Sequence, residues 1–399
     1  MTDSIALLPR EPHPSADDFA PPPTDADLAR WAEADAAARS GRLASLRERF
    51  AREGIDAYFG VRPEHSRYLT GFALGNGEEK VAGDSGRFLV GADEVVVFAD
   101  SRYTLQAQRE ATGARIEPVY GDLPDRWRDL VASIGARRVA VEAGAVNVAT
   151  WRALVDAAPD IELVPIEGWL EHDRATKHPS EIERIAAACA VADRALATLL
   201  PEIAPGLTER DLALRLEWLM RTDGAEALAF DVACLAGPEA ALPHGSPGDR
   251  RIEPGQVLLF DFGAQVGGYR SDMTRTLFVG EPALRDLEVY LVVARAQQAA
   301  FETLRAAAPG DVPSGRAVDE AAREVIEAAG HGAHFGHGTG HGIGLATHEE
   351  PRLSRTAPAR PLPGPTVFSV EPGVYLPGET GVRIEDLVAF DPAAGRVEL

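Results

Sequence analysis

Apolar residues recur with a helical period near the start of the chain and in short β-like runs after it. Residues 25 to about 52 (DADLARWAEADAAARSGRLASLRERFAR) predict a helix, in which Ser40-Gly41 is the expected place for a break. Runs rich in β-branched and aromatic residues predict strands at IDAYFGV, GRFLVG, EVVVFAD, RRVAVEA and IELVPI. Helical stretches lie between them at about 101–111, 122–134 and 147–158. This alternation predicts a mixed α/β domain that ends near Ile166.

The second part of the chain shows a different order of elements. After a linker-like segment at 171–179 (EHDRATKHP), helical patterns occur at about 181–200, 208–223, 283–308 and 315–329. A β-hairpin pattern follows each pair of helices, and this order predicts an antiparallel sheet with helices on one face, an α+β domain. We therefore expect a poorly ordered, Pro-rich lead at 1–24, an N-terminal α/β domain at 25–170 and a C-terminal domain at 171–399.

Each hairpin pattern carries two acidic residues. Asp261 and Asp272 flank a Gly-Gly turn in VLLFDFGAQVGGYRSDMTRTLFV. Glu371 and Glu385 flank a Gly-containing turn in VFSVEPGVYLPGETGVRIEDLVAF. In each hairpin the two acids lie about equally far from the turn. We therefore expect them to face each other across the ladder, with Cβ atoms ~4.5–5.5 Å apart.

Four carboxylates held this close need a source of positive charge. Opposed like charges repel, and burying them without compensation is costly. Two divalent cations would bring four positive charges, and hard oxygen ligands suit Mn²⁺, Co²⁺ or Mg²⁺. The two acidic pairs therefore predict a site for two metal ions.

Five of the ten histidines lie near the acidic hairpins in sequence. Three occur within HFGHGTGHGIG (His334, His337 and His341), where the repeated glycines disfavour a helix and let the backbone approach a ligand. His348 follows in ATHEEP, and His244 lies in a Pro/Gly loop before the first acidic strand. A single such histidine is commonly structural, but the cluster beside four acids favours a metal or substrate site.

Composition restricts the function classes. The net charge is −22, so a polyanion would be repelled, and we expect no nucleic-acid partner. Two cysteines form no disulfide framework. We see neither a secretory signal nor a run of about 20 apolar residues for a membrane span, and we expect a cytoplasmic protein.

The motifs together resemble the pita-bread metallopeptidases, specifically the prolidase and aminopeptidase P group. The matching stretches are ALPHGSPGDRRIEPGQVLLFDFGAQVGGYRSDMTRT, GHGTGHGIGLATHEEPRLS and VFSVEPGVYLPGETGVRIED. YLTGF and DSRY are similar, more weakly, to the family's creatinase-like N-terminal domain. The resemblance implies an α+β fold, in which an α/β creatinase-like domain precedes a pita-bread (creatinase/aminopeptidase-like) catalytic domain.

The resemblance also implies a ligand set for two divalent ions, Mn²⁺ or Co²⁺, with Zn²⁺ as an alternative. Asp272 and Glu385 would bridge both ions, Asp261 would bind one, and His341 with Glu371 the other. A hydroxide bridging the ions would attack the scissile carbonyl, and Glu371 would accept the proton from the attacking water.

The same resemblance implies roles around the substrate. His244 and His348 would contact the scissile carbonyl and stabilise the developing oxyanion. His337 would support the pocket, and Arg383 would orient the carboxylates. Phe230 stands where some aminopeptidase P relatives carry a Tyr, which argues against a phenolic proton shuttle at that position.

The expected function is metal-dependent hydrolysis of an Xaa-Pro bond by a homodimeric Xaa-Pro dipeptidase acting on proline-containing dipeptides. The amide before proline has no N–H and a rigid ring, so it escapes most general peptidases. Aminopeptidase P activity on longer peptides is the closest alternative. A non-catalytic binding module or metal-free creatinase-like chemistry is disfavoured because all five ligands are present, and a methionine aminopeptidase is disfavoured by the N-terminal domain.

Overall fold

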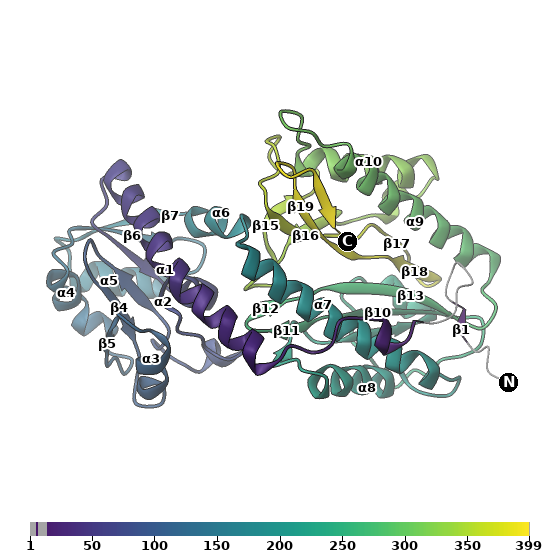
Figure 1. Cartoon of the computed structure of the whole chain (residues 1–399), viewed down its shortest axis with the longest axis horizontal. Helices are drawn as coiled ribbons and strands as arrows, with labels where there is room; N and C mark the ends of the chain where they lie inside the picture. Colours follow the sequence, from purple (N-terminus) through teal and green to yellow (C-terminus); the bar gives the residue numbers. More distant parts are fainter. Residues whose placement is uncertain (1–4, 7–13, 399) are drawn as a thin grey trace. The chain divides into compact units, whose positions relative to one another are not determined.

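The computed structural model describes residues 5–6 and 14–398 and divides into two compact units (Figure 1). One unit comprises Met1–Leu28 and Glu171–Leu399, and the other comprises Ala29–Leu170. The predicted lead at 1–24 lies partly outside the described residues. Within it, Ala16–Asp18 form a short 3-10 helix, and the Ala16 carbonyl accepts a hydrogen bond from Arg194 Nη1 at 3.0 Å. Among the described helices, none has the length and apolarity that crossing a membrane requires.

The first long helix, α1 (Asp25–Glu53), is continuous. The break expected at Ser40-Gly41 is therefore wrong. A helical Gly costs only about 1 kcal/mol relative to Ala, and the surrounding Ala, Arg and Leu residues favour helix.

The smaller unit is built on a mixed six-stranded sheet in the order β5-β4-β3-β2-β6-β7. β2, β6 and β7 run parallel, as do β4 and β5, whereas β3 is antiparallel to both of its neighbours. The strands are β2 (Ala57–Gly60), β3 (Phe88–Val90), β4 (Val95–Phe98), β5 (Arg115–Glu117), β6 (Arg138–Glu142) and β7 (Glu162–Ile166). The helices are α2 (Pro63–Thr70), α3 (Thr104–Glu110), α4 (Leu123–Ser133) and α5 (Val148–Ala157). The predicted α/β character is confirmed, while α2 and β5 were not predicted.

The segment predicted as a linker is mostly helical. α6 (Trp169–Ala175) is followed closely by α7 (Pro179–Leu199). His178 caps α7 through Nδ1, which accepts from the Ser180 N–H at 3.3 Å, and Pro179 occupies the first helical position. Pro is favoured there because its missing N–H has no partner to lose.

The larger unit is built from antiparallel sheets, as predicted. Its first half contains β8 (Ala227–Leu228), β9 (Ala233–Ala236), β10 (Val257–Phe262), β11 (Ala264–Val266), β12 (Tyr269–Arg270) and β13 (Met273–Val279), with β1 (Ile5–Ala6) paired to β13. Its second half contains β14 (Gly340–Gly342), β15 (Glu349–Leu353), β16 (Thr366–Val370), β17 (Gly373–Leu376), β18 (Thr380–Arg383), β19 (Asp386–Asp391) and β20 (Arg396–Glu398).

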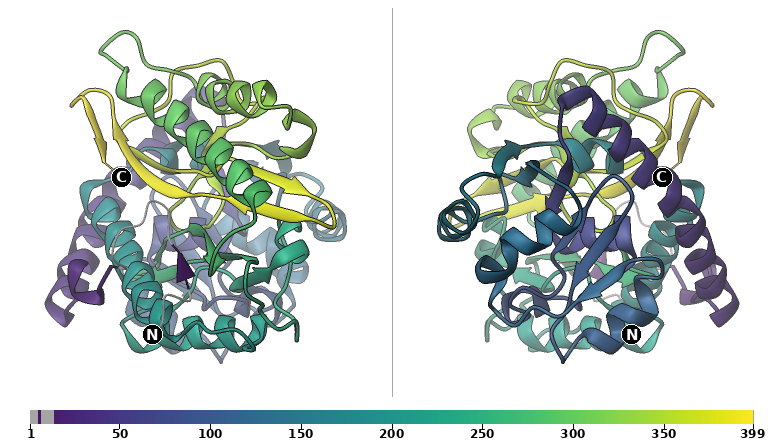
Figure 2. Two further views of the ribbon diagram at one scale, coloured as in Figure 1. Left: turned by 90° about the vertical axis from the view of Figure 1, so that its right-hand side faces the viewer. Right: turned by 90° about the vertical axis from the view of Figure 1, so that its left-hand side faces the viewer.

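Two helix pairs accompany these strands. α7 and α8 (Glu209–Thr222) pack together in the first half, and α9 (Leu284–Arg305) and α10 (Gly315–Ala328) pack together in the second. Figure 2 shows the green α9 and α10 lying over the yellow strands β16 to β19. Their shared core is apolar and includes Val293, Ile326, Phe368 and Val382. This packed layer supports the strands that carry the second acidic pair.

Candidate metal centre

The first acidic pair does not stand directly opposite in the ladder. Asp261 on β10 pairs with Thr274, so Asp272 lies diagonally across from it. The reason is the two-residue turn: Val266 pairs with Tyr269, and both intervening glycines have positive φ. Such a turn fixes the register of both strands. The prediction of directly facing acids is therefore wrong for this hairpin.

The second acidic pair has the predicted register. Val370 pairs with Asp386 in β16–β19, and Gly373 pairs with Arg383 in β17–β18. Continued between these two ladders, the register places Glu371 opposite Glu385. Both glutamates therefore lie in a gap between ladders, where their backbone is free to bond elsewhere.

The predicted ligands converge in the folded unit. Ligand atoms of Asp272, His341 and Glu385 all lie within 4.8 Å of one another, and the three residues are buried. His341 Nε2 is 3.7 Å from Asp272 Oδ2 and 3.2 Å from Glu371 Oε1. Asp261 and Glu371 line the same cavity, whose volume is about 1020 Å³.

The protein alone does not neutralise these acids. Burial raises the pKa of Asp272 well above the usual carboxyl range, and the neighbouring Glu385 adds to the rise. Burial, followed by Glu371 and Asp261, does the same to Glu385. Burial would also raise the pKa of Glu371, but the hydrogen bond with His341 and the positive charges of His341, His337 and Arg383 together outweigh it and lower that pKa to about 2. Burial raises the pKa of Asp261 despite the nearby Arg383 guanidinium.

Several donor atoms are suited to a cation. Asp261 Oδ1 and Glu385 Oε1 are buried and accept no hydrogen bond from the described residues. His341 Nδ1 lies 3.0 Å from the Gly342 carbonyl, which can only accept, so Nδ1 carries a proton, and Nε2, which faces the acids, would bind a cation after losing its own proton. Carboxylate oxygens with one imidazole nitrogen form a donor set that suits divalent cations such as Mn²⁺, Co²⁺ or Zn²⁺. The residues present therefore fit a metal site.

Arg383 organises one wall of the site, in line with its predicted role. Its guanidinium donates to Asp261 Oδ2 at 2.5 Å, to Thr274 Oγ1 at 2.8 Å and to Tyr375 Oη at 2.9 Å. Thr274 in turn donates to Glu385 Oε2 at 2.7 Å. The Arg383 guanidinium thereby fixes one acid of each hairpin, Asp261 directly and Glu385 through Thr274. Thr274 and Tyr375 were not predicted, although Thr274 lies two residues after Asp272 on the same strand face.

His337 lies behind this wall rather than free in the cavity. Its Nδ1 is 2.8 Å from the Gly338 carbonyl and its Nε2 is 2.9 Å from Tyr375 Oη. Burial raises the pKa of Tyr375 to about 12 and lowers that of His337. The neutral imidazole therefore accepts the phenolic proton, a contact that fits the predicted supporting role.

His244 and His348 line the cavity with exposed side chains. The His348 ring lies 4.1 Å from that of His341, centroid to centroid. Burial, with the positive charge of His341, lowers the pKa of His348 to about 4, so it is neutral near pH 7. Phe230 also lines the cavity.

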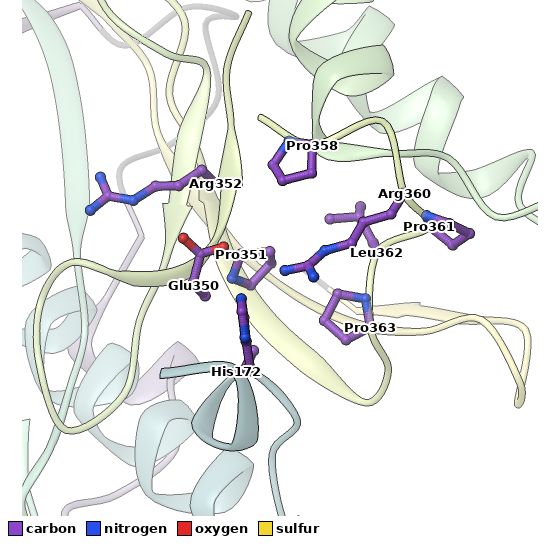
Figure 3. Close-up of a pocket in the computed structure, with 11 residues that line it drawn as sticks. His172, Glu350, Pro351, Arg352, Pro358, Arg360, Pro361, Leu362 and Pro363 are labelled. Carbon is purple, nitrogen blue, oxygen red and sulfur yellow. The ribbon is translucent and has the colours of Figure 1, made fainter. Parts of the chain in front are cut away.

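Arg352 is a further cavity residue that was not predicted. It also borders a smaller neighbouring pocket of about 280 Å³, lined by Arg360, Leu362 and four prolines. Figure 3 shows the Arg352 side chain turned away from those prolines. Among the described residues no carboxylate forms an ion pair with Arg352, so its charge is available to a ligand.

Comparison with known proteins identifies the family. Residues 183–392 match metallopeptidase family M24, and residues 42–176 match the creatinase/prolidase N-terminal domain. An uncharacterized peptidase of Bacillus subtilis, YqhT, is 36% identical over 89% of this chain and 96% of its own length. The Xaa-Pro dipeptidase structure from Bacillus anthracis matches with a TM-score of 0.79 at 34% identity, over 89% of this chain and 96% of that one. The X-Pro aminopeptidase structure from Thermotoga maritima matches with a TM-score of 0.77 at 34% identity, over 87% of this chain and 94% of that one. The chain therefore belongs to metallopeptidase family M24, with a creatinase-like N-terminal domain followed by a pita-bread peptidase domain.

Proposed function

We propose that this metallopeptidase hydrolyses Xaa-Pro bonds as an Xaa-Pro dipeptidase that uses two divalent cations. The observation that carries the proposal is the buried cluster of Asp272, His341 and Glu385, with unpartnered oxygens on Asp261 and Glu385. Asp261, Asp272, His341, Glu371 and Glu385 would hold the ions. Bound cations would lower the pKa of water towards neutrality and polarise the scissile carbonyl.

The chain's own residues would then carry the proton and hold the substrate. Glu371 stays ionised, since its pKa is lowered by His341, and Ser369 orients it through a 2.9 Å hydrogen bond. It would accept a proton from the attacking water. That proton is needed on the proline nitrogen when the C–N bond breaks. Neutral His348, with His244, would donate a hydrogen bond to the carbonyl oxygen as charge develops on it.

Arg352 supports dipeptide specificity. In an Xaa-Pro dipeptide the C-terminal carboxylate belongs to the residue directly after the scissile bond. Its recognition needs a nearby positively charged side chain that forms no ion pair within the protein. Arg352 lines the cavity and meets that condition. A longer peptide presents a neutral amide there and gains less from the arginine.

The comparison of Ala-Pro with Ala-Pro-Ala tests this proposal. We expect Ala-Pro to be cleaved efficiently by wild type, and Arg352→Ala to raise KM for Ala-Pro far more than for Ala-Pro-Ala. Fast hydrolysis of Ala-Pro-Ala without hydrolysis of Ala-Pro would instead indicate aminopeptidase P activity. The similarity to the X-Pro aminopeptidase of Thermotoga maritima supports that alternative. Failure to take up any divalent ion would favour a non-catalytic binding module.

We also propose Mn²⁺ or Co²⁺ as the activating ions, with Zn²⁺ as the alternative, in a cytoplasmic homodimer. The oxygen-rich donor set supports Mn²⁺ and Co²⁺. Reconstitution of chelated protein with each ion separately would rank them by activity. Light scattering coupled to size-exclusion chromatography would test the dimer, and cell fractionation would test the location.

A further inference from the structure

α9 buries one polar side chain within an otherwise apolar stripe. Seven of its eight buried residues are apolar, and the eighth is Gln297, which is 7% exposed. A buried amide is costly unless its donors are satisfied, so its partners are informative. Its place on the helix points it at the strands of the second acidic hairpin.

Gln297 reaches both strands of that hairpin. Its Nε2 lies 3.2 Å from the Val370 carbonyl, 3.3 Å from the Ile384 carbonyl and 2.9 Å from Asp386 Oδ2. Carbonyls and carboxylates only accept, so the –NH₂ group must face them. Val370 precedes Glu371, while Ile384 and Asp386 flank Glu385. The amide therefore joins the backbone carbonyl that precedes each of the two proposed ligands, together with the side chain of Asp386.

These contacts lie where the ladder of the hairpin is interrupted. The Glu371 N–H bonds to the Thr339 carbonyl at 2.7 Å, and the Glu385 N–H bonds to the Thr274 carbonyl at 3.2 Å. The two glutamate N–H groups thus bond to different neighbouring segments, and within the described structure the ladder has no pair at Glu371 and Glu385. The ladders on either side hold the two strands together, and Gln297 bridges the gap itself from the helix side.

We infer that Gln297 is a positioning residue for the metal centre, which sets the spacing between Glu371 and Glu385 and hence the affinity for the cations. The inference rests on the proposed two-cation function. It adds a residue 74 positions before Glu371 in sequence that touches neither substrate nor metal. Because metal ligands must be held in a fixed geometry, loss of this bridge should weaken binding even where the fold survives.

The test compares two glutamines of one helix. Gln297→Met keeps the length and removes the donors, whereas Gln298→Met changes an exposed neighbour whose amide reaches only Glu302, at 3.4 Å. Calorimetric titration of chelated protein with Mn²⁺ should show Kd for at least one ion rising by about 10–100-fold in Gln297→Met, the range seen when outer partners of metal ligands are removed. Gln298→Met should titrate like wild type.

A second readout needs no metal. In the chelated protein, hydrogen exchange of the peptide segment 366–390 should be faster in Gln297→Met and unchanged in Gln298→Met. A purely structural role would lower the melting temperature and leave both Mn²⁺ affinities at wild-type values, and that result would overturn the inference.

Should Gln297→Met not fold, Gln297→Asn decides, since it keeps a neutral amide but is one methylene shorter, which draws the donors back from the three acceptors. A folded Gln297→Asn with weakened Mn²⁺ affinity supports the bridge, while a folded variant with wild-type affinity for both ions contradicts it. If wild type itself binds no divalent ion, the proposed function fails together with the inference. If wild type binds Mn²⁺ and Gln297→Met binds it with the same affinity, the inference fails while the proposed function stands.

Discussion

At the scale of single residues, Asp272 is a buried acid whose charge the protein compensates poorly. Its fully buried carboxyl faces Glu385, Asp261 and Glu371, with Arg383 as the opposing charge. We expect Asp272→Ala to abolish turnover, because a proposed metal ligand is lost and the remaining acids are left undercompensated. Metal content by mass spectrometry should fall below that of wild type. Asp249→Ala, at an exposed ion pair with Arg210, should change neither quantity. Retained turnover in Asp272→Ala would contradict the ligand set.

His244 offers a contrast, because it lines the cavity outside the cluster of proposed ligands and is proposed to contact the substrate. We expect His244→Ala to keep its metal and lose about 10²–10³-fold in kcat, equivalent to about 2.7–4 kcal/mol of transition-state stabilisation. Steady-state kinetics beside metal analysis would separate the two effects. His172→Ala, on α6 and outside the cavity, serves as the matched control. Wild-type kcat in His244→Ala would remove His244 from the oxyanion contacts.

At the scale of elements, α10 holds the Gly-rich loop that leads into β14. Asp319 and Arg323 form a buried ion pair with distances of 2.9 and 3.0 Å. Asp319 Oδ1 also accepts from the backbone N–H and the hydroxyl of Thr339, and Arg323 donates to the Phe335 and His337 carbonyls. One helix thereby fixes both ends of the loop.

We expect Asp319→Ala to lower the free energy of unfolding by about 3–5 kcal/mol, because it leaves a buried guanidinium unpaired. Denaturant titration would measure the loss. Glu320→Ala, one residue along α10 and exposed, should have little effect. The double variant Asp319→Leu/Arg323→Met should recover part of the stability, since no buried charge remains. Equal destabilisation by the single and double variants would show that the ion pair is not the cause.

The two hairpins show which geometry the sequence could predict. The second hairpin has a three-residue loop centred on Gly378, and equal spacing from that glycine gave the right register for Glu371 and Glu385. The first turns at Gly267-Gly268, as expected, but Asp261 lies six residues before Gly267 whereas Asp272 lies only four residues after Gly268, so the ladder pairs Asp261 with Thr274. The turn was predicted correctly there, and only the assumption of equal spacing from it was wrong.

Contacts between elements that are distant in sequence could not be predicted from the local sequence pattern. Ligand types, the strand and helix order and the α+β class follow from periodicity and motif, and the structure confirms that class. Tyr375, Arg352 and Gln297 carry no local signal, since each becomes informative only when tertiary packing places it beside residues far away in sequence. The clustering of His341 with the acids was expected from residue type, but its distances depend on β14 lying next to β16.

At the scale of the whole molecule, removal of the cations should lower stability in a pH-dependent way. Without metal, the folded-state pKa values of Asp272 and Glu385 lie well above their unfolded values. Such groups bind more protons when folded, so the metal-free protein loses stability as pH rises from the acid range and regains it as pH falls through the raised pKa values. Cations replace those protons and remove the penalty.

We therefore expect the difference in melting temperature between metal-loaded and chelated protein to be largest at neutral pH and to shrink towards pH 5. Calorimetry in matched buffers with EDTA or saturating Mn²⁺ would measure it, and hydrogen exchange should place the protection in Glu171–Leu399 rather than in Ala29–Leu170. In Asp272→Ala the pH dependence should be weaker, because one of the two proton-binding acids is gone. A metal effect that grew on acidification would contradict this expectation, because protons compete with the cation at the carboxylates and at His341 alike.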